Sequence, residues 1–80
     1  MVKFELVVKS IKDLEDIYNA ASKQRFNIDA GHGTHQVDAK SLMGLMSLSL
    51  PNVIEVECWS DKEGVKEFEQ MIEHLKVRWV

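Results

Sequence analysis

The chain has 80 residues, of which 45% are hydrophobic and 29% are charged, and its formal net charge at pH 7 is −3. This composition is typical of a folded globular protein, and the length suits a single domain over residues 1–80. Basic residues are interleaved with acidic ones, which argues against a nucleic-acid partner. With no apolar run of membrane-spanning length and no basic, apolar leader, we expect a cytoplasmic protein that does not bind membranes.

The first two elements are a strand and a helix. In residues 2–8, Phe4, Leu6 and Val8 are expected inward, while Lys3, Glu5 and Val7 share the other face, which predicts a half-buried strand. Ser10 then offers a capping hydroxyl, and Asp13 follows three residues later, a weaker relative of the capping box. The helix is expected over residues 11–23. Its apolar stripe consists of Ile11, Leu14, Ile17, Tyr18 and Ala21.

A hairpin follows, because the pattern changes from a helical period to a period of two at Arg25. The turn is expected at Gly31-His32-Gly33, since glycines can adopt the positive φ that a chain reversal requires. The predicted inward side chains of the two strands are Phe26, Ile28, Ala30, His35, Val37 and Ala39.

Two more helices and a strand complete the chain. Ser41 is expected to cap a short helix whose shared face holds Leu42, Leu45, Met46 and Ser49. Residues 52–59 alternate again, as in a fourth strand with Ile54, Val56 and Cys58 inward, and Ser60-Asp61-Lys62-Glu63 forms a capping box for the last helix. The buried seam of that helix is Val65, Phe68, Ile72 and Leu75, with Met71 at its edge. The tail, residues 77–80, either packs or forms a last strand.

The predicted order is therefore strand, helix, strand, strand, helix, strand, helix. With three helices on one face of an antiparallel four-stranded sheet, this is an α+β open-faced sandwich.

The segment Ala39-Lys40-Ser41-Leu42-Met43-Gly44-Leu45 resembles the Ala-Lys-Ser-Leu-x-x-Leu segment that opens the second helix of HPr, the phosphocarrier of the bacterial sugar phosphotransferase system. The HPr family has the same βαββαβα order of elements. The resemblance therefore implies an HPr-like fold over nearly the whole chain, and it implies a phosphocarrier rather than an enzyme.

The family carries its phosphate on a histidine at the start of the first helix, in a Gly-x-His-Ser/Thr-Arg-Pro-Ala motif. Counting back from the matching segment places Ser10 at the histidine and Lys12 at the arginine, with Asp13 at the proline. Serine cannot form the phosphoramidate through which histidine passes phosphate on, and Asp13 repels a phosphate at this helix end. The departure implies that phosphocarrier activity has been lost, and that Ser10 is a simple helix cap.

Ser41 lines up with the second phosphorylation site of HPr proteins from Gram-positive bacteria, where a dedicated kinase modifies the serine for regulation. Beside it, Leu42, Met43 and Met46 offer an adaptable apolar contact. The resemblance therefore implies a monomeric binding or regulatory module, with a partner of the phosphotransferase-system or transcriptional-regulator type.

Two alternatives stay open. A phosphotransfer protein of this kind can use His32 or His35 in place of the lost residue, although the simpler reading makes His32 a solvated turn residue and His35 a partly buried strand residue. Alternatively, the surfaces around Trp59 and Trp79 contact an unrelated complex. Two histidines across a turn supply only half a metal site, so no metal or other cofactor is expected.

Overall fold

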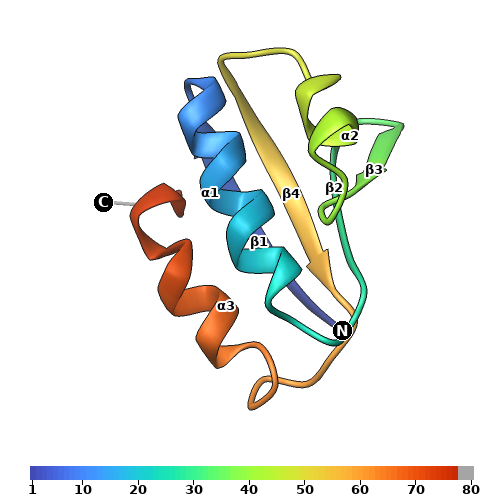
Figure 1. The fold of residues 1–80 in the computed structure, drawn as a ribbon, viewed down its shortest axis with the longest axis vertical. Helices are drawn as coiled ribbons and strands as arrows, with labels where there is room; N and C mark the ends of the chain where they lie inside the picture. Colours follow the sequence, from blue (N-terminus) through green and yellow to red (C-terminus); the bar gives the residue numbers. More distant parts are fainter. Residues whose placement is uncertain (78–80) are drawn as a thin grey trace.

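The computed structural model describes residues 1–77 and confirms the predicted order of elements, with a short 3₁₀ helix, η1, added at the end. Figure 1 shows the chain from the first strand to the last helix. The elements are β1 (Val2–Val8), α1 (Ile11–Ser22), β2 (Ile28–His32), β3 (His35–Asp38), α2 (Leu42–Met46), β4 (Asn52–Cys58), α3 (Lys66–Met71) and η1 (Glu73–Leu75).

The four strands form one sheet in the order β1-β4-β2-β3, and every neighbouring pair is antiparallel. Val2 of β1 lies opposite Cys58 of β4, and Ile28 of β2 lies opposite the same residue from the other side. Strands β1 and β2 therefore flank β4 and run in the same direction. This order separates the end of β1, where α1 begins, from the β2–β3 hairpin.

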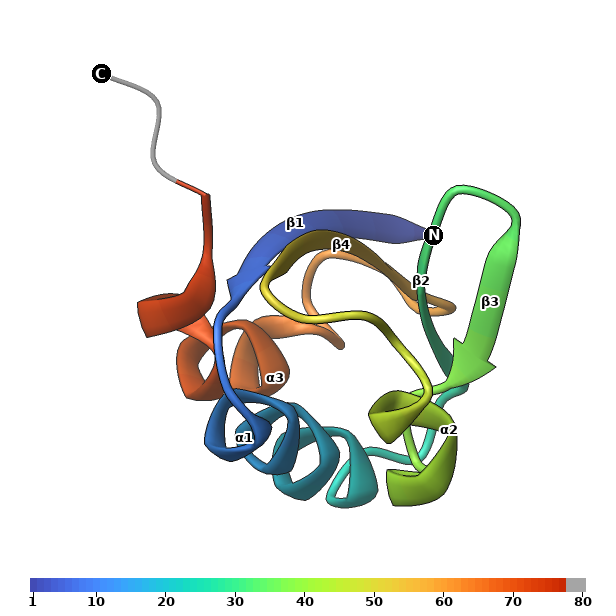
Figure 2. The same ribbon diagram turned by 90° about the horizontal axis from the view of Figure 1, so that it is seen from above.

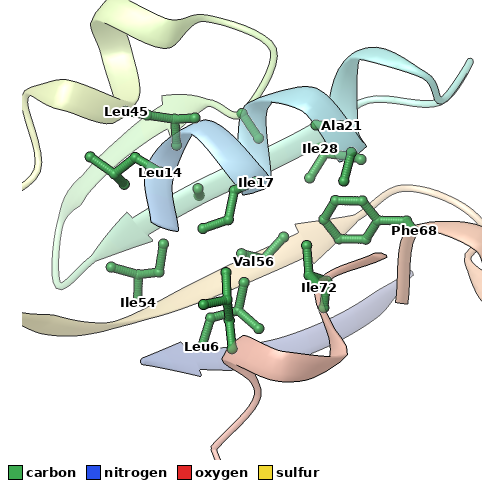
Figure 3. Close-up of a cluster of buried hydrophobic side chains, with 14 of the residues drawn as sticks. Leu6, Leu14, Ile17, Ala21, Ile28, Leu45, Ile54, Val56, Phe68 and Ile72 are labelled. Carbon is green, nitrogen blue, oxygen red and sulfur yellow. The ribbon is translucent and has the colours of Figure 1, made fainter. Parts of the chain in front are cut away.

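The helices lie on one side of the sheet, and Figure 2 shows that none of the described residues forms a layer on the other side. The inward side chains of the strands and helices meet in a single hydrophobic cluster, part of which Figure 3 shows. Because alternation places successive side chains on opposite faces, the predicted inward set is confirmed for Leu6, Val8, Ile28, Ala30, Ile54, Val56 and Cys58, all fully buried.

The hairpin turn is displaced from its expected place. His32 pairs directly with His35, so the turn consists of Gly33 and Thr34, and Gly31 is a buried strand residue. Gly33 has a φ of +63°, which supplies the left-handed conformation of the turn. Gly31 meets a different requirement: a Cβ there would lie 2.3 Å from the carbonyl oxygen of His35. Close strand approach, not chain reversal, explains this glycine.

The prediction that His35 is partly buried is wrong. His35 is exposed, because it lies on the edge strand β3, which only the short helix α2 covers. The predicted apolar faces of two helices also need correction at their ends. Ile11 is 53% exposed in the first turn of α1, and Met46 is 50% exposed because α2 ends there after five residues. Leu45 is buried as predicted, and Leu48, rather than Met46, joins it in the core beneath α2.

The last helix begins later than its capping box predicts, and it is divided into α3 and η1. Ser60 does not cap it; the Asp61 carboxylate accepts a hydrogen bond from the amide of Gly64, at 2.7 Å. A Cβ on Gly64 would lie 2.2 Å from the Ser60 hydroxyl, which would have to rotate away to make room. The seam of Val65, Phe68, Ile72 and Leu75 is buried as predicted, with Met71 partly buried at its edge.

After η1 the chain returns to the free edge of β1. Lys76 forms a β-bridge with Leu6, and the amide of Val77 donates to the carbonyl oxygen of Glu5 at 2.9 Å. The tail thus begins strand pairing, while the rest of the segment predicted at residues 77–80 lies outside the described residues. Within the described part, no helix has the length and apolar character needed to cross a membrane.

Candidate functional site

At the start of α1, side chains of the same segment accept hydrogen bonds from backbone amides. The Ser10 hydroxyl accepts a hydrogen bond from the amide of Asp13 at 3.4 Å, as a helix cap does. The Asp13 carboxylate accepts in return from the amide of Lys9 at 2.8 Å, one residue earlier than in a standard capping box. The first turn of α1 therefore presents a hydroxyl and a carboxylate of its own residues.

Lys12 is held by an acid of its own helix. Its ammonium group pairs with the Asp16 carboxylate, which also accepts from Nε2 of His74 at 3.0 Å. These two contacts, that of Lys12 being the larger, lower the pKa of Asp16, and the same carboxylate raises the pKa of Lys12. Lys12 is thus engaged in an exposed ion pair.

His74 is the residue near this end of α1 that local sequence reasoning missed. It comes from η1, 58 residues after its partner Asp16, and it lines a hollow of about 410 Å³ together with Lys9 and Asp13 of the α1 start. No local pattern signals this contact, since it depends on how η1 packs against α1. The remaining lining residues are Val7, Leu75 and Lys76.

The hollow is not a free basic site. The Lys76 ammonium lies 2.6 Å from Glu69 and 3.6 Å from Glu73, which raises the pKa of Lys76. Asp13 adds a further carboxylate to the lining. Lys76 and His74 of the lining thus each contact a carboxylate, which weakens the attraction of the hollow for a phosphate.

Ser41 caps α2. Its hydroxyl accepts from the amide of Gly44 at 3.1 Å, and its own amide donates to the carbonyl oxygen of Asp38 at 2.9 Å. Ser41 is itself partly exposed, between the buried Ala39 and Leu45. The cap fixes where the chain turns from β3 into α2, so the segment that matches the family motif has a clear structural role.

The methionines of α2 face solvent. Met43 is 85% exposed and Met46 is 50% exposed, whereas Leu42 is half-buried. With Ser41 at the start of the same helix, these side chains form a small apolar surface, which we call the α2 surface (Ser41, Leu42, Met43 and Met46). Because flexible thioethers adapt to irregular shapes, such a surface suits protein contact.

The two hairpin histidines do not converge on one site. Nδ1 of His32 lies 3.2 Å from the carbonyl oxygen of Val53, and Nε2 of His35 lies 2.9 Å from the Ser47 hydroxyl. In the part of the chain that the structure describes, no three His, Cys, Asp or Glu side chains are grouped so that they could hold a metal ion. The sheet order places β4 between His32 and the end of β1, two strand spacings or about 10 Å.

Cys58 and Trp59 have different surroundings. Cys58 is buried in the core, where burial and, to a lesser degree, Glu69 raise the pKa of its thiol to about 12. Trp59 is 54% exposed, and its indole N–H donates to the Asp29 carboxylate at 3.0 Å. Trp79 lies outside the described residues.

Three solved structures share this architecture. HPr-C-His from Thermoanaerobacter tengcongensis aligns with a TM-score of 0.71 at 27% identity, over 91% of this chain and 92% of its own. The phosphocarrier protein HPr from Bacillus anthracis aligns with a TM-score of 0.69 at 17% identity, over 92% and 95%. The histidine-containing phosphocarrier protein of Mycoplasma aligns with a TM-score of 0.69 at 17% identity, over 91% and 93%.

The chain has the HPr-like fold. The three alignments extend over 91–92% of this chain and 92–95% of the solved structures. No protein-family model matches the sequence, and no curated protein matches it. An HPr-like fold can serve functions other than phosphate transfer, so the function has to be argued from the site.

Proposed function

We propose that this chain is a non-enzymatic, cytoplasmic HPr-like protein of a single domain that has lost phosphocarrier activity and acts as a binding and regulatory module. The observation that carries the proposal is the start of α1. There Ser10, at the position aligned with the family's phosphohistidine, is a helix cap. Phosphoryl transfer through histidine needs a P–N bond at an imidazole nitrogen, and a serine hydroxyl offers only a stable ester.

Electrostatics at the same helix end support the proposal. The Asp13 carboxylate lies against the first turn, bonded to the Lys9 amide, and Lys12 is paired with Asp16. A phosphoryl group arriving here would meet one nearby carboxylate, and the lysine at the arginine position would have to leave its partner. Both features oppose the reaction that HPr proteins perform.

The α2 surface is the proposed contact site. Its exposed methionines lie next to Ser41. The sequence resemblance aligns Ser41 with the serine that is phosphorylated for regulation in HPr proteins of Gram-positive bacteria. Phosphorylation would add nearly two negative charges beside this apolar contact, and would thereby change which partner binds. The expected partner is a protein of the phosphotransferase-system or transcriptional-regulator type, bound by a monomer of this chain.

The regulatory part is tested with an HPr serine kinase and ATP. We expect one phosphoryl group on the intact protein, at Ser41, and none on Ser41→Ala. Ser49→Ala is the matched control, because Ser49 is exposed just beyond the same helix and should leave labelling unchanged. No labelling of the unaltered protein, or labelling that persists in Ser41→Ala, would remove the regulatory role.

The alternative is a phosphotransfer protein that uses His32 or His35. Each ring has one nitrogen in a hydrogen bond and leaves the other for a phosphoryl group. Neither histidine lies at a helix start, however, where amide groups would stabilise the phosphate. Incubation with enzyme I and phosphoenolpyruvate separates the two functions: an acid-labile phosphate that is lost in His32→Ala or His35→Ala would establish the alternative.

A further inference from the structure

We propose that the open face of the sheet is a second interaction surface, which binds a partner protein through an extended, arginine- or lysine-rich segment. The surface is separate from the α2 surface, and it does not depend on Ser41 or on the fate of the phosphocarrier reaction. It is the side of the sheet opposite the helices in Figure 2.

Charge is concentrated on this side. The outward positions of all four strands carry acidic side chains, which we call the acidic face: Glu5, Glu55, Glu57, Asp29 and Asp38. Lys3 is the basic residue among them, so the face has a net charge of −4, whereas the whole chain has −3. The rest of the sequence holds nine basic and eight acidic residues. The acidic excess of this protein therefore lies on the open face.

The sheet register sets these like charges directly opposite one another. Glu5 pairs with Glu55, Glu57 pairs with Asp29, and Asp29 pairs in turn with Asp38. Like charges in directly opposed positions destabilise a sheet. Lys3 offsets part of this repulsion, with its ammonium 3.4 Å from Glu57 and 3.8 Å from Glu55. An arrangement that costs stability across all four strands is explained by a partner that supplies the missing positive charge.

The shape of the face suits a long basic side chain. A hollow of about 420 Å³ opens beside Glu5 and Glu55, and Gly31 contributes no side chain to its lining. At the other end of the face, the indole of Trp59 is 54% exposed and is held by Asp29. A guanidinium group can stack on such a ring while it pairs with the neighbouring carboxylate.

These features distinguish between possible occupants. A second copy bound face to face would bring together two acidic faces that each have a net charge of −4, and Coulomb repulsion disfavours this. A metal ion is not expected either, since among the described residues no three His, Cys, Asp or Glu side chains lie close enough together to hold one. Carboxylates about 5 Å apart across strands and about 7 Å apart along a strand match alternate side chains of an extended peptide. The occupant is therefore a basic, extended protein segment.

The test uses the full chain and a synthetic peptide of alternating arginine and serine residues, titrated at low salt and followed by backbone amide NMR. We expect the largest shifts in β1, β4 and β2. In Glu5→Gln/Glu55→Gln the affinity should fall about three- to tenfold, from the loss of two exposed charge contacts. The matched control is Glu15→Gln/Glu63→Gln, which makes the same change in net charge at exposed positions outside the face and should change affinity less than twofold.

The face variant removes an opposed like-charge pair, so its midpoint of thermal unfolding should not fall, and weaker binding cannot then be attributed to unfolding. Equal losses in both double variants would show attraction by net charge alone and would overturn the proposal. Shifts confined to the helices, or no binding by the unaltered protein, would also overturn it. So would self-association through this face in sedimentation. None of these results bears on Ser10 or Ser41, so failure here leaves the proposed function intact.

Discussion

The two helix caps allow a prediction about Ser41 that separates its structural role from any modification. In Ser41→Ala, the amide of Gly44 loses its acceptor at 3.1 Å, and α2 loses its side-chain cap. In Ser10→Ala the lost contact is longer, 3.4 Å, and the amide of Asp13 keeps the carbonyl oxygen of Ser10 at 3.1 Å. Ser41 is partly buried and Ser10 is exposed. The Ser41 cap should therefore contribute more to stability.

We expect Ser41→Ala to lower the free energy of unfolding by about 1 kcal/mol, the usual loss for a serine cap, and Ser10→Ala to lower it by less than half of that. For a domain of this size, 1 kcal/mol corresponds to a fall of about 4–8 °C in the unfolding midpoint. Ser41→Asp should keep most of the stability, because a carboxylate can also cap a helix. The Ser41→Ala protein stays folded and is a valid control for the kinase experiment.

The assay is urea unfolding followed by circular dichroism, with Ser49→Ala as the variant of an exposed serine next to the same helix. Equal slopes of free energy against urea would show that only stability has changed. If Ser10→Ala lowered the free energy of unfolding as much as Ser41→Ala, the greater contribution of the Ser41 cap would be wrong. If Ser41→Asp were as unstable as Ser41→Ala, the hydrogen bond of the cap would not explain the loss of stability.

Three further predictions concern pH, thiol chemistry and the hairpin. Lys12 lowers the pKa of Asp16, so the stabilisation from their contact is present above the usual carboxyl pKa of 3.8 and is lost as pH falls through the lowered value. Lys12→Met should therefore raise the pKa of Asp16, measured by a ¹³C NMR titration. An unchanged pKa would contradict the contact. The Cys58 thiol, with a pKa of about 12, should react with Ellman's reagent only after unfolding, and fast reaction of the native protein would contradict its burial. Gly31→Ala should lower the free energy of unfolding in urea by about 1–3 kcal/mol, because the Cβ of the alanine would meet the backbone oxygen of His35. An unchanged free energy of unfolding would contradict that close approach.

The sequence was sufficient to predict the strands because alternation reports directly which side chains face a core. Leu6, Ile54 and Cys58 are buried for this reason, and the order of elements followed from the changes between periods of two and 3.6. Helix starts at Ser10 and Ser41 were equally clear, since a capping hydroxyl acts within its own turn.

Features that depend on tertiary contact were not predictable in the same way. Gly31 was expected in the turn, but the pairing of His32 with His35 moves the reversal to Gly33, and nothing in the local sequence distinguishes the two glycines. The capping box predicted at Ser60 does not form: α3 begins at Lys66 without a side-chain cap, and the Asp61 carboxylate accepts from the Gly64 amide in the turn before it.

For the candidate site, the sequence placed Ser10 and Ser41 at helix starts, and the structure has them there as caps. The contact of His74 with Asp16 spans 58 residues and required the packed structure. The acidic face likewise required the register, because alternation alone shows which acids point outward but not which of them lie opposite one another.

The central claim, that an HPr-like chain has lost phosphocarrier activity, is tested most directly by intact mass after incubation with enzyme I and phosphoenolpyruvate. A functional HPr in the same reaction serves as the positive control. We expect an unchanged mass for this chain, while the control gains one phosphoryl group. A stoichiometric, acid-labile phosphate on this chain would contradict the claim. His32→Ala, His35→Ala and His74→Ala would then show which imidazole carries the phosphate.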